Sequence, residues 1–233
     1  MTWTLIESAT ERDAVLELYG KDGKFMIRAN GLELMNGFCH ESETALGTFA
    51  AGLAPSGCGR FLVGGLGLGY TAAALLRTLG DGGRVTVAEL SSAVIDWFHR
   101  HVRASVLPTT HGNLAIVNAD IADLLKEINR YDVIILDVDN GPEPLVTAAN
   151  AGLYSTDGLR ALHGCLADCG VALLWSGFEA AEFAARAEEV GFAVMCERFS
   201  RERADLDHHI YVLAKSDAAA TTRQIPNINH VVV

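Results

Sequence analysis

Two aspartates stand where a continuous apolar run ends. Asp137 and Asp139 close the segment YDVIILDVD (131–139), and such a run is typical of a parallel strand buried on both faces. A carboxylate there can take the proton that an amine must lose before it attacks as a nucleophile, and strand alternation points both side chains to one face. The pair predicts a catalytic base, and Asn140, directly after it, is a candidate substrate-binding residue. The alternative is that Asp137 caps the strand or the following turn.

Four glycines fall within six positions of FLVGGLGLGYT (61–71), between an apolar run and a helical pattern. Gly65, Gly67 and Gly69 form G-x-G-x-G, which matches neither the dinucleotide fingerprint nor a phosphate-binding P-loop. A loop without Cβ atoms can instead run flat beneath a sugar and an amino-acid tail. We expect either an adenosyl ligand without pyrophosphate or a purely structural turn. Tyr70 either covers that ligand or packs in the core.

Two acids follow the next two predicted strands. Glu89 ends one of them, where an acid is expected to bind both ribose hydroxyls of a nucleoside. Asp120 follows the next strand, where its carboxylate can accept the adenine amino group or cap the helix that follows. Because ligands of doubly wound sheets bind beyond the carboxyl ends of the strands, both acids and the glycine loop predict one nucleoside site.

An alternation of strands and helices positions these residues. Apolar runs predict strands at 60–64, 84–90, 114–118, 131–139, 171–176, 192–200 and 208–215. Helical patterns occupy 70–80, 92–102, 121–129, 155–170 and 178–191. The expected fold class is α/β, a Rossmann-like doubly wound sheet of seven strands with the last strand antiparallel at the end of the sheet.

The first part of the chain has a different pattern. Short runs at 14–18, 24–29 and 32–35 are separated by the hairpin signals Lys21-Asp22-Gly23 and Asn30-Gly31, and a helix is expected at 41–53. We therefore expect three parts: a small N-terminal β-hairpin and helix element (1–54), a nucleoside-binding catalytic domain (55–215) and a flexible tail (216–233).

Composition narrows the possible partners. The 233 residues include 29 acidic and 18 basic side chains, a net charge of −11 that argues against binding nucleic acid or an anionic membrane. The five cysteines form no CxxC pair; Cys165 and Cys169 are expected on one face of a helix, without zinc-finger spacing. We expect no metal. The first residues lack the features of a signal peptide and no run is long enough to span a membrane, so a cytoplasmic location is expected.

The order of these motifs resembles the spermidine synthase (polyamine aminopropyltransferase) family over roughly residues 24–214. The resemblance rests on FCHESE, FLVGGLGLGYT, VTVAELSSAVIDW, YDVIILDVDNGPEPLV and the closing HHIYVLA. It implies an N-terminal β-domain, a Rossmann-like catalytic domain, a homodimer, and transfer of the aminopropyl group of decarboxylated S-adenosylmethionine to an amine. His40 and Glu41 resemble a Tyr-His-Glu segment at the mouth of the family's active site, which implies a substrate-binding role.

Two departures from the family pattern bear on the product. The family's glycine loop is usually GGGDGG, whose aspartate holds the donor's ammonium group, and the matching position here is Gly67. The family's D-x-x-D-P is one residue shorter here, as Asp137-Val138-Asp139-Asn140-Gly141-Pro142.

These features predict a transferase that uses S-adenosylmethionine or its decarboxylated form on a small amine-type metabolite. Room beside Gly67 for a donor carboxylate would favour intact S-adenosylmethionine. The alternatives are a small-molecule methyltransferase and a catalytically silent nucleoside-binding protein. A nicotinamide-dependent reductase is disfavoured by the missing third fingerprint glycine.

Overall fold

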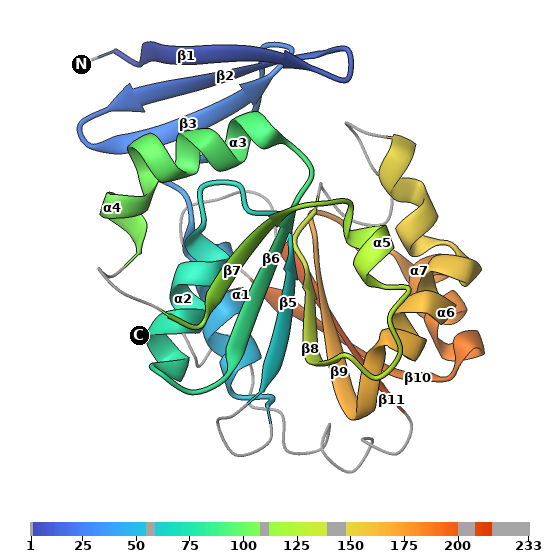
Figure 1. Ribbon diagram of the computed structural model, residues 1–233. Coiled ribbons are helices and arrows are strands. Elements are labelled where there is room, and N and C mark those ends of the chain that lie inside the picture. Colours follow the sequence, from blue (N-terminus) through green and yellow to red (C-terminus); the bar gives the residue numbers. More distant parts are fainter. Residues whose placement is uncertain (1, 55–58, 108–111, 139–147, 200–207, 216–233) are drawn as a thin grey trace.

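The structure is a computed structural model that describes residues 2–54, 59–107, 112–138, 148–199 and 208–215. Within these ranges the chain forms a four-stranded sheet and a seven-stranded sheet. Figure 1 shows the smaller sheet at one end of the molecule, next to α3 (Ser92–Trp97), and helices on both faces of the larger sheet. The predicted α/β class, with a seven-stranded Rossmann-like sheet and a small N-terminal β element, is confirmed.

The N-terminal sheet is antiparallel and follows the order of the chain. Its strands are β1 (Thr4–Glu11), β2 (Ala14–Lys21), β3 (Lys24–Ala29) and β4 (Leu32–Asn36). Asp22-Gly23 and Asn30-Gly31 each have two successive positive φ angles, as in the two-residue turns that join twisted strands. Both predicted hairpins are confirmed. β1 was not expected, because most of its side chains are exposed and only pairing with β2 defines it.

The larger sheet has the order β10-β11-β9-β8-β5-β6-β7. Its strands are β5 (Arg60–Gly64), β6 (Arg84–Glu89), β7 (Leu114–Asn118), β8 (Tyr131–Leu136), β9 (Leu166–Ser176), β10 (Phe192–Phe199) and β11 (His208–Lys215). Strands β5 to β9 are parallel, and β11 is antiparallel to both of its neighbours. The last strand is therefore antiparallel, as expected, but it lies between β9 and β10 and not at the end of the sheet.

Two apolar cores cover the two faces of this sheet, and strand β8 contributes to both. Val133 and Ile135 belong to one core, whereas Ile134 and Leu136 belong to the other. This arrangement explains the continuous apolar run in the sequence. The first core also contains side chains from α1 (Glu41–Ala51), α2 (Tyr70–Leu79), α3 and α4 (Arg103–Val106). The second contains side chains from α5 (Ile121–Leu124), η3 (Ala148–Tyr154), α6 (Thr156–Cys165) and α7 (Ala181–Val190).

The helix expected at 155–170 ends early, at Cys165, and β9 begins with the next residue. Leu166 is buried and pairs with Tyr131 of β8, so the sheet takes over a segment that a helical pattern also fits. Cys169 consequently lies in the strand. The expectation that Cys165 and Cys169 share a helix face was wrong.

Two other helices differ in length from expectation. The helix predicted at 121–129 is a single turn, α5. The helix predicted at 92–102 continues from α3 through a π-helical turn, η2 (Phe98–Val102), into α4. No helix in the described ranges is long and apolar enough to cross a membrane.

Polar contacts from β1 attach the N-terminal sheet to the helix formed by α3 and η2. The Glu7 carboxylate accepts hydrogen bonds from Trp97 Nε1 (3.1 Å) and from both terminal nitrogens of Arg100 (2.6 and 2.8 Å), and it pairs with His101. Glu11 accepts a hydrogen bond from Ser92 Oγ at 2.6 Å. These contacts keep the small sheet beside the carboxyl edge of the large one.

Candidate active site

A cavity of about 650 Å³ lies at the carboxyl ends of β5, β6, β7 and β8. The glycine loop after β5, the residues that follow the other three strands, and all five residues of β4 line it. The volume is typical of a small-molecule site. The topology thus brings most of the predicted site residues to one place.

The glycine loop is shaped by the protein's own packing. Gly65 has a φ of +89°, and a Cβ there would collide with the backbone oxygen of Asp137. Gly67 has a φ of +51°, and a Cβ there would lie 2.6 Å from Met35 Sδ of β4. The space beside Gly67 that was expected to admit a donor carboxylate is therefore occupied by Met35. Gly69 precedes α2 and also lines the cavity.

Glu89 is held by the backbone on two sides. Leu66 N donates to its Oε2 at 2.9 Å, and Ser91 N donates to its Oε1 at 2.8 Å. Each carboxylate oxygen keeps a second lone pair, and Glu89 lines the cavity. The glycine loop and the end of β6 are thus joined through the side chain that was predicted to bind ribose.

Asp120 caps a helix and also lines the cavity. Its Oδ1 accepts a hydrogen bond from Ala122 N at 2.9 Å, which caps α5. The residue also lines the cavity. Cap and cavity positions are compatible, because one carboxylate oxygen satisfies the cap and the other is left for a ligand.

Asp137 faces the cavity from the end of β8. Its Oδ2 accepts a hydrogen bond from Thr71 Oγ1 at 2.6 Å. The residue as a whole is partly exposed, whereas its carboxyl group is surrounded by protein. Burial, and then the charge of Glu43, raise the pKa of Asp137 to about 7, although the Thr71 hydrogen bond acts in the opposite direction. Asp139 and Asn140 lie outside the described residues.

The segment FCHESE contributes differently from expectation. His40 stacks on Tyr70, with ring centroids 3.9 Å apart and planes 6° apart, and its Nδ1 lies 3.1 Å from Thr44 Oγ1. Tyr70 lines the cavity; burial first, and then the charge of Glu43, raise its pKa. Glu41 is exposed and is not among the residues that line the cavity. Its predicted substrate role has no geometric support here.

The polar cavity residues that sequence reasoning missed include Glu43, Thr71 and His208. Glu43 lies in the first turn of α1, about one helical turn after His40, where an acidic side chain is also favoured by the helix dipole. Thr71 is 4% exposed, and its position directly after the loop was the only available signal. His208 lines the cavity and packs edge-on against Trp175, with ring centroids 4.8 Å apart.

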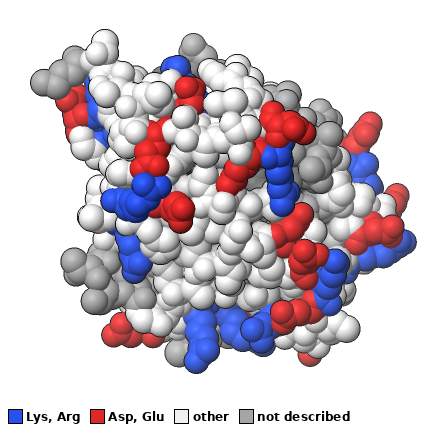
Figure 2. Space-filling view, turned by 45° about the horizontal axis from the view of Figure 1, so that its top comes forward, with Lys and Arg blue, Asp and Glu red and all other residues white. Residues whose placement is uncertain are grey.

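The charge of the cavity differs from that of the surface. Five acidic residues line it: Glu33, Glu43, Glu89, Asp120 and Asp137. Among the described lining residues there is no lysine or arginine. By contrast, Figure 2 shows acidic and basic side chains interspersed over one face of the molecule, with large uncharged areas between them. Within the described residues, no group of three or more His, Cys, Asp or Glu side chains is arranged to hold a metal ion.

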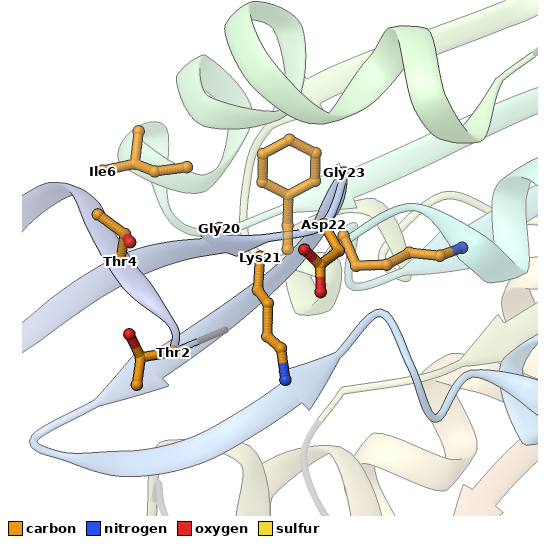
Figure 3. Close-up of a pocket in the computed structure, with 9 residues that line it drawn as sticks. Thr2, Thr4, Ile6, Gly20, Lys21, Asp22 and Gly23 are labelled. Carbon is orange, nitrogen blue, oxygen red and sulfur yellow. The ribbon is translucent and has the colours of Figure 1, made fainter.

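A second hollow, of about 630 Å³, lies on the N-terminal sheet around the β2–β3 hairpin (Figure 3). Lys21, Asp22 and Lys24 line it. The Lys21 ammonium lies 6.0 Å from the ring of Trp3 and 5.6 Å from that of Phe38. Among its described lining residues Asp22 is the one carboxylate, whereas five acidic residues line the cavity at the carboxyl edge of the large sheet, so we place the candidate active site there.

Comparisons with known proteins identify the fold. No protein-family model matches the chain, and no curated protein sequence does. A spermidine synthase from Thermotoga maritima superposes with a TM-score of 0.72 at 18% identity, over 91% of this chain and 73% of that one. A spermidine synthase in complex with the transition-state analogue AdoDATO gives 0.68 at 17% identity, over 91% and 72%.

A probable spermidine synthase from Corynebacterium glutamicum ATCC 13032 gives a TM-score of 0.65 at 18% identity, over 94% of this chain and 86% of that one. All three structures share both the N-terminal and the Rossmann-like part of the chain, as the extent of the superpositions shows. The chain therefore has a spermidine synthase-like fold.

Proposed function

We propose that this protein transfers an aminopropyl group from decarboxylated S-adenosylmethionine to a small amine. The observation that carries the proposal is the charge of the cavity, which has five acidic lining residues and no lysine or arginine among those described. Nucleotides and other anionic ligands need cations or dipoles directed at them. A donor with a sulfonium and an ammonium group, and an amine acceptor, both match an acidic cavity. AdoDATO bound to a spermidine synthase of the same fold supports this choice of donor.

The donor is expected to lie across the glycine loop. We assign its ribose hydroxyls to the second lone pairs of Glu89, whose orientation is fixed by Leu66 N and Ser91 N. Asp120 is assigned to the adenine amino group. We place the reacting carbon next to the sulfonium beside Asp137, whose backbone oxygen lies against Gly65.

In the reaction, the neutral amine nitrogen attacks the aminopropyl carbon that is bonded to the sulfonium sulfur. A C–N bond forms, the C–S bond breaks, and its electron pair stays on sulfur, which leaves neutral methylthioadenosine. The nitrogen loses a proton, and we assign that proton to Asp137. A pKa of about 7 suits a general base at neutral pH. Asp139 remains a predicted second acid.

Methyl transfer from intact S-adenosylmethionine is the second candidate. Gly67 favours it, because the resemblance places there the aspartate that would hold the ammonium group of a decarboxylated donor. The occupation of the neighbouring space by Met35 weakens that argument.

Product analysis tests the proposal. The protein is incubated with either donor and a set of primary amines, and nucleoside products are separated by chromatography. Aminopropyl transfer releases methylthioadenosine, whereas methyl transfer releases S-adenosylhomocysteine. Binding of either donor without product would favour the catalytically silent alternative, and the absence of any nucleoside binding would refute the proposal.

A further inference from the structure

We propose that strand β4 selects an acceptor amine with an apolar tail. This inference rests on the proposed function, and it concerns the part of the cavity that β4 lines. It starts from an irregular pairing of β4 with β3, which lets β4 line the cavity along its whole length.

β4 contains a bulge. It pairs with β3 through Ile27 opposite Met35 and Arg28 opposite Glu33, so Leu34 has no partner in the register. In a regular strand, neighbouring side chains point to opposite faces, yet every residue from Leu32 to Asn36 lines the cavity. A bulge redirects side chains and is common beside active sites. The bulge explains how one edge strand lines the cavity along its whole length.

The apolar residues that β4 presents are exposed. Leu32 is 64% and Leu34 is 38% exposed, although both line the cavity. Met35 from the same strand covers Gly67. A ligand that covers these side chains gains about fourfold in affinity for each buried methylene. β4 therefore presents three apolar side chains to the cavity, those of Leu32, Leu34 and Met35, whereas Glu43 and Asp137 make another side acidic.

This division orients an amine. Its nitrogen is attracted to Glu43 and Asp137, and its other end then meets Leu32 and Leu34. Glu33 is the acid on β4, and its exposed carboxylate accepts a hydrogen bond from Asn36 Nδ2 at 3.1 Å. A solvated carboxylate of this kind contributes little to binding a second ammonium group. The arrangement thus favours an alkylamine over a diamine.

A matched pair of amines tests this. Pentylamine and 1,4-diaminobutane have the same number of non-hydrogen atoms and differ only in a terminal methyl or amino group. We expect calorimetry to show that pentylamine binds about tenfold or more tightly than 1,4-diaminobutane, because only its end can be buried without desolvating a charge. Equal binding, tighter binding of the diamine, or binding of neither amine would overturn the inference.

Variants locate the effect. Leu34→Asp and Leu32→Asp should each remove the preference or reverse it. Leu5→Asp is the control, because Leu5 is a 49% exposed leucine of the same sheet that does not line the cavity, and it should keep the preference. A preference unchanged in both β4 variants would contradict the role of the strand. Circular dichroism confirms that each variant is folded.

Experiments can refute the role of β4 without refuting the proposed function. Titration with methylthioadenosine measures the nucleoside site, and the amines are titrated both with and without it. If the unmodified protein does not bind methylthioadenosine, the result counts against the proposed function. Nucleoside binding without the amine preference counts against the role of β4 only.

Discussion

Strand β5 is flanked by two strands that each end in a carboxylate, and the two carboxylates differ in their surroundings. Glu89, the last residue of β6, accepts hydrogen bonds from two backbone N–H groups, at 2.9 and 2.8 Å. Asp137 after β8 receives one hydroxyl group, at 2.6 Å, and lies near the charge of Glu43. Two backbone donors orient a carboxylate as a hydrogen-bond acceptor. Burial with few donors instead raises the pKa of a carboxyl group, so that it can exchange a proton near neutral pH. One sheet edge can thus provide a binding group and a base.

The largest effect is expected from Asp137→Asn. An amide cannot accept the proton, so turnover should fall by about 10²- to 10⁴-fold. The asparagine can still accept the Thr71 hydrogen bond, and donor binding measured by calorimetry should change little. Unchanged turnover would remove Asp137 from the proposed mechanism.

Asp132→Asn is the matched control for that variant. Asp132 lies at the other end of β8 and pairs with Arg60 at 2.9 Å, far from the lining of the cavity. Loss of this ion pair should reduce the free energy of unfolding by about 1 kcal/mol or less, because both side chains are partly exposed to solvent. Turnover should stay the same.

Glu89→Gln should weaken the binding of the nucleoside. The amide has one acceptor oxygen, so it cannot satisfy Leu66 N, Ser91 N and two ribose hydroxyls as the carboxylate does. Methylthioadenosine affinity should fall about 10- to 100-fold in calorimetric titrations. Glu41→Gln, at an exposed residue that does not line the cavity, serves as control. Equal losses in the two variants would contradict the assignment of Glu89.

The pH dependence of turnover should follow Asp137. As a base it works when deprotonated, so activity should rise as the pH passes through about 7. Thr71→Val removes a hydrogen bond that lowers this pKa, and the rising limb should move to higher pH, with activity several-fold lower at neutral pH. The test is a pH–rate profile of the unmodified protein and of Thr71→Val. If the rising limb has the same midpoint in both, it reports the titration of a group other than Asp137.

A smaller effect concerns stability. Because the pKa of Asp137 is raised in the folded state, its contribution is fully present below the ordinary aspartate pKa and is lost as the pH rises through about 7. The Asn variant lacks this loss. Between pH 4 and 8, the unfolding free energy of the unmodified protein should therefore decline relative to that of Asp137→Asn. Parallel curves in denaturant titrations would contradict burial of the ionised carboxyl group.

Asp120→Asn should have the smallest effect. Asparagine caps a helix about as well as aspartate, so the unfolding temperature should be nearly unchanged. Nucleoside affinity should fall a few-fold if the second carboxylate oxygen accepts the adenine amino group. An unchanged affinity would leave Asp120 as a cap only, the alternative that the sequence left open.

Several elements could be predicted from local sequence patterns. The run 131–136 predicted a strand buried on both faces, and its alternate residues indeed enter two cores. Asn30-Gly31 predicted a turn because few residue pairs adopt two positive φ angles readily. By contrast, residues 166–170 fit a helical pattern, and the pairing of Leu166 with Tyr131 of β8 makes this segment the start of a strand. Local patterns could not include that pairing.

By itself, the sequence determined the class of fold and the strand ends that carry Glu89, Asp120 and Asp137, because the periodicity that predicts strands and helices is a local property of the sequence. Only the tertiary structure decided what surrounds them. Met35 beside Gly67, Thr71 on Asp137 and the leucines of β4 at the cavity come from elements far apart in the chain. Contacts of this kind depend on how sheets and helices pack, which no local pattern records.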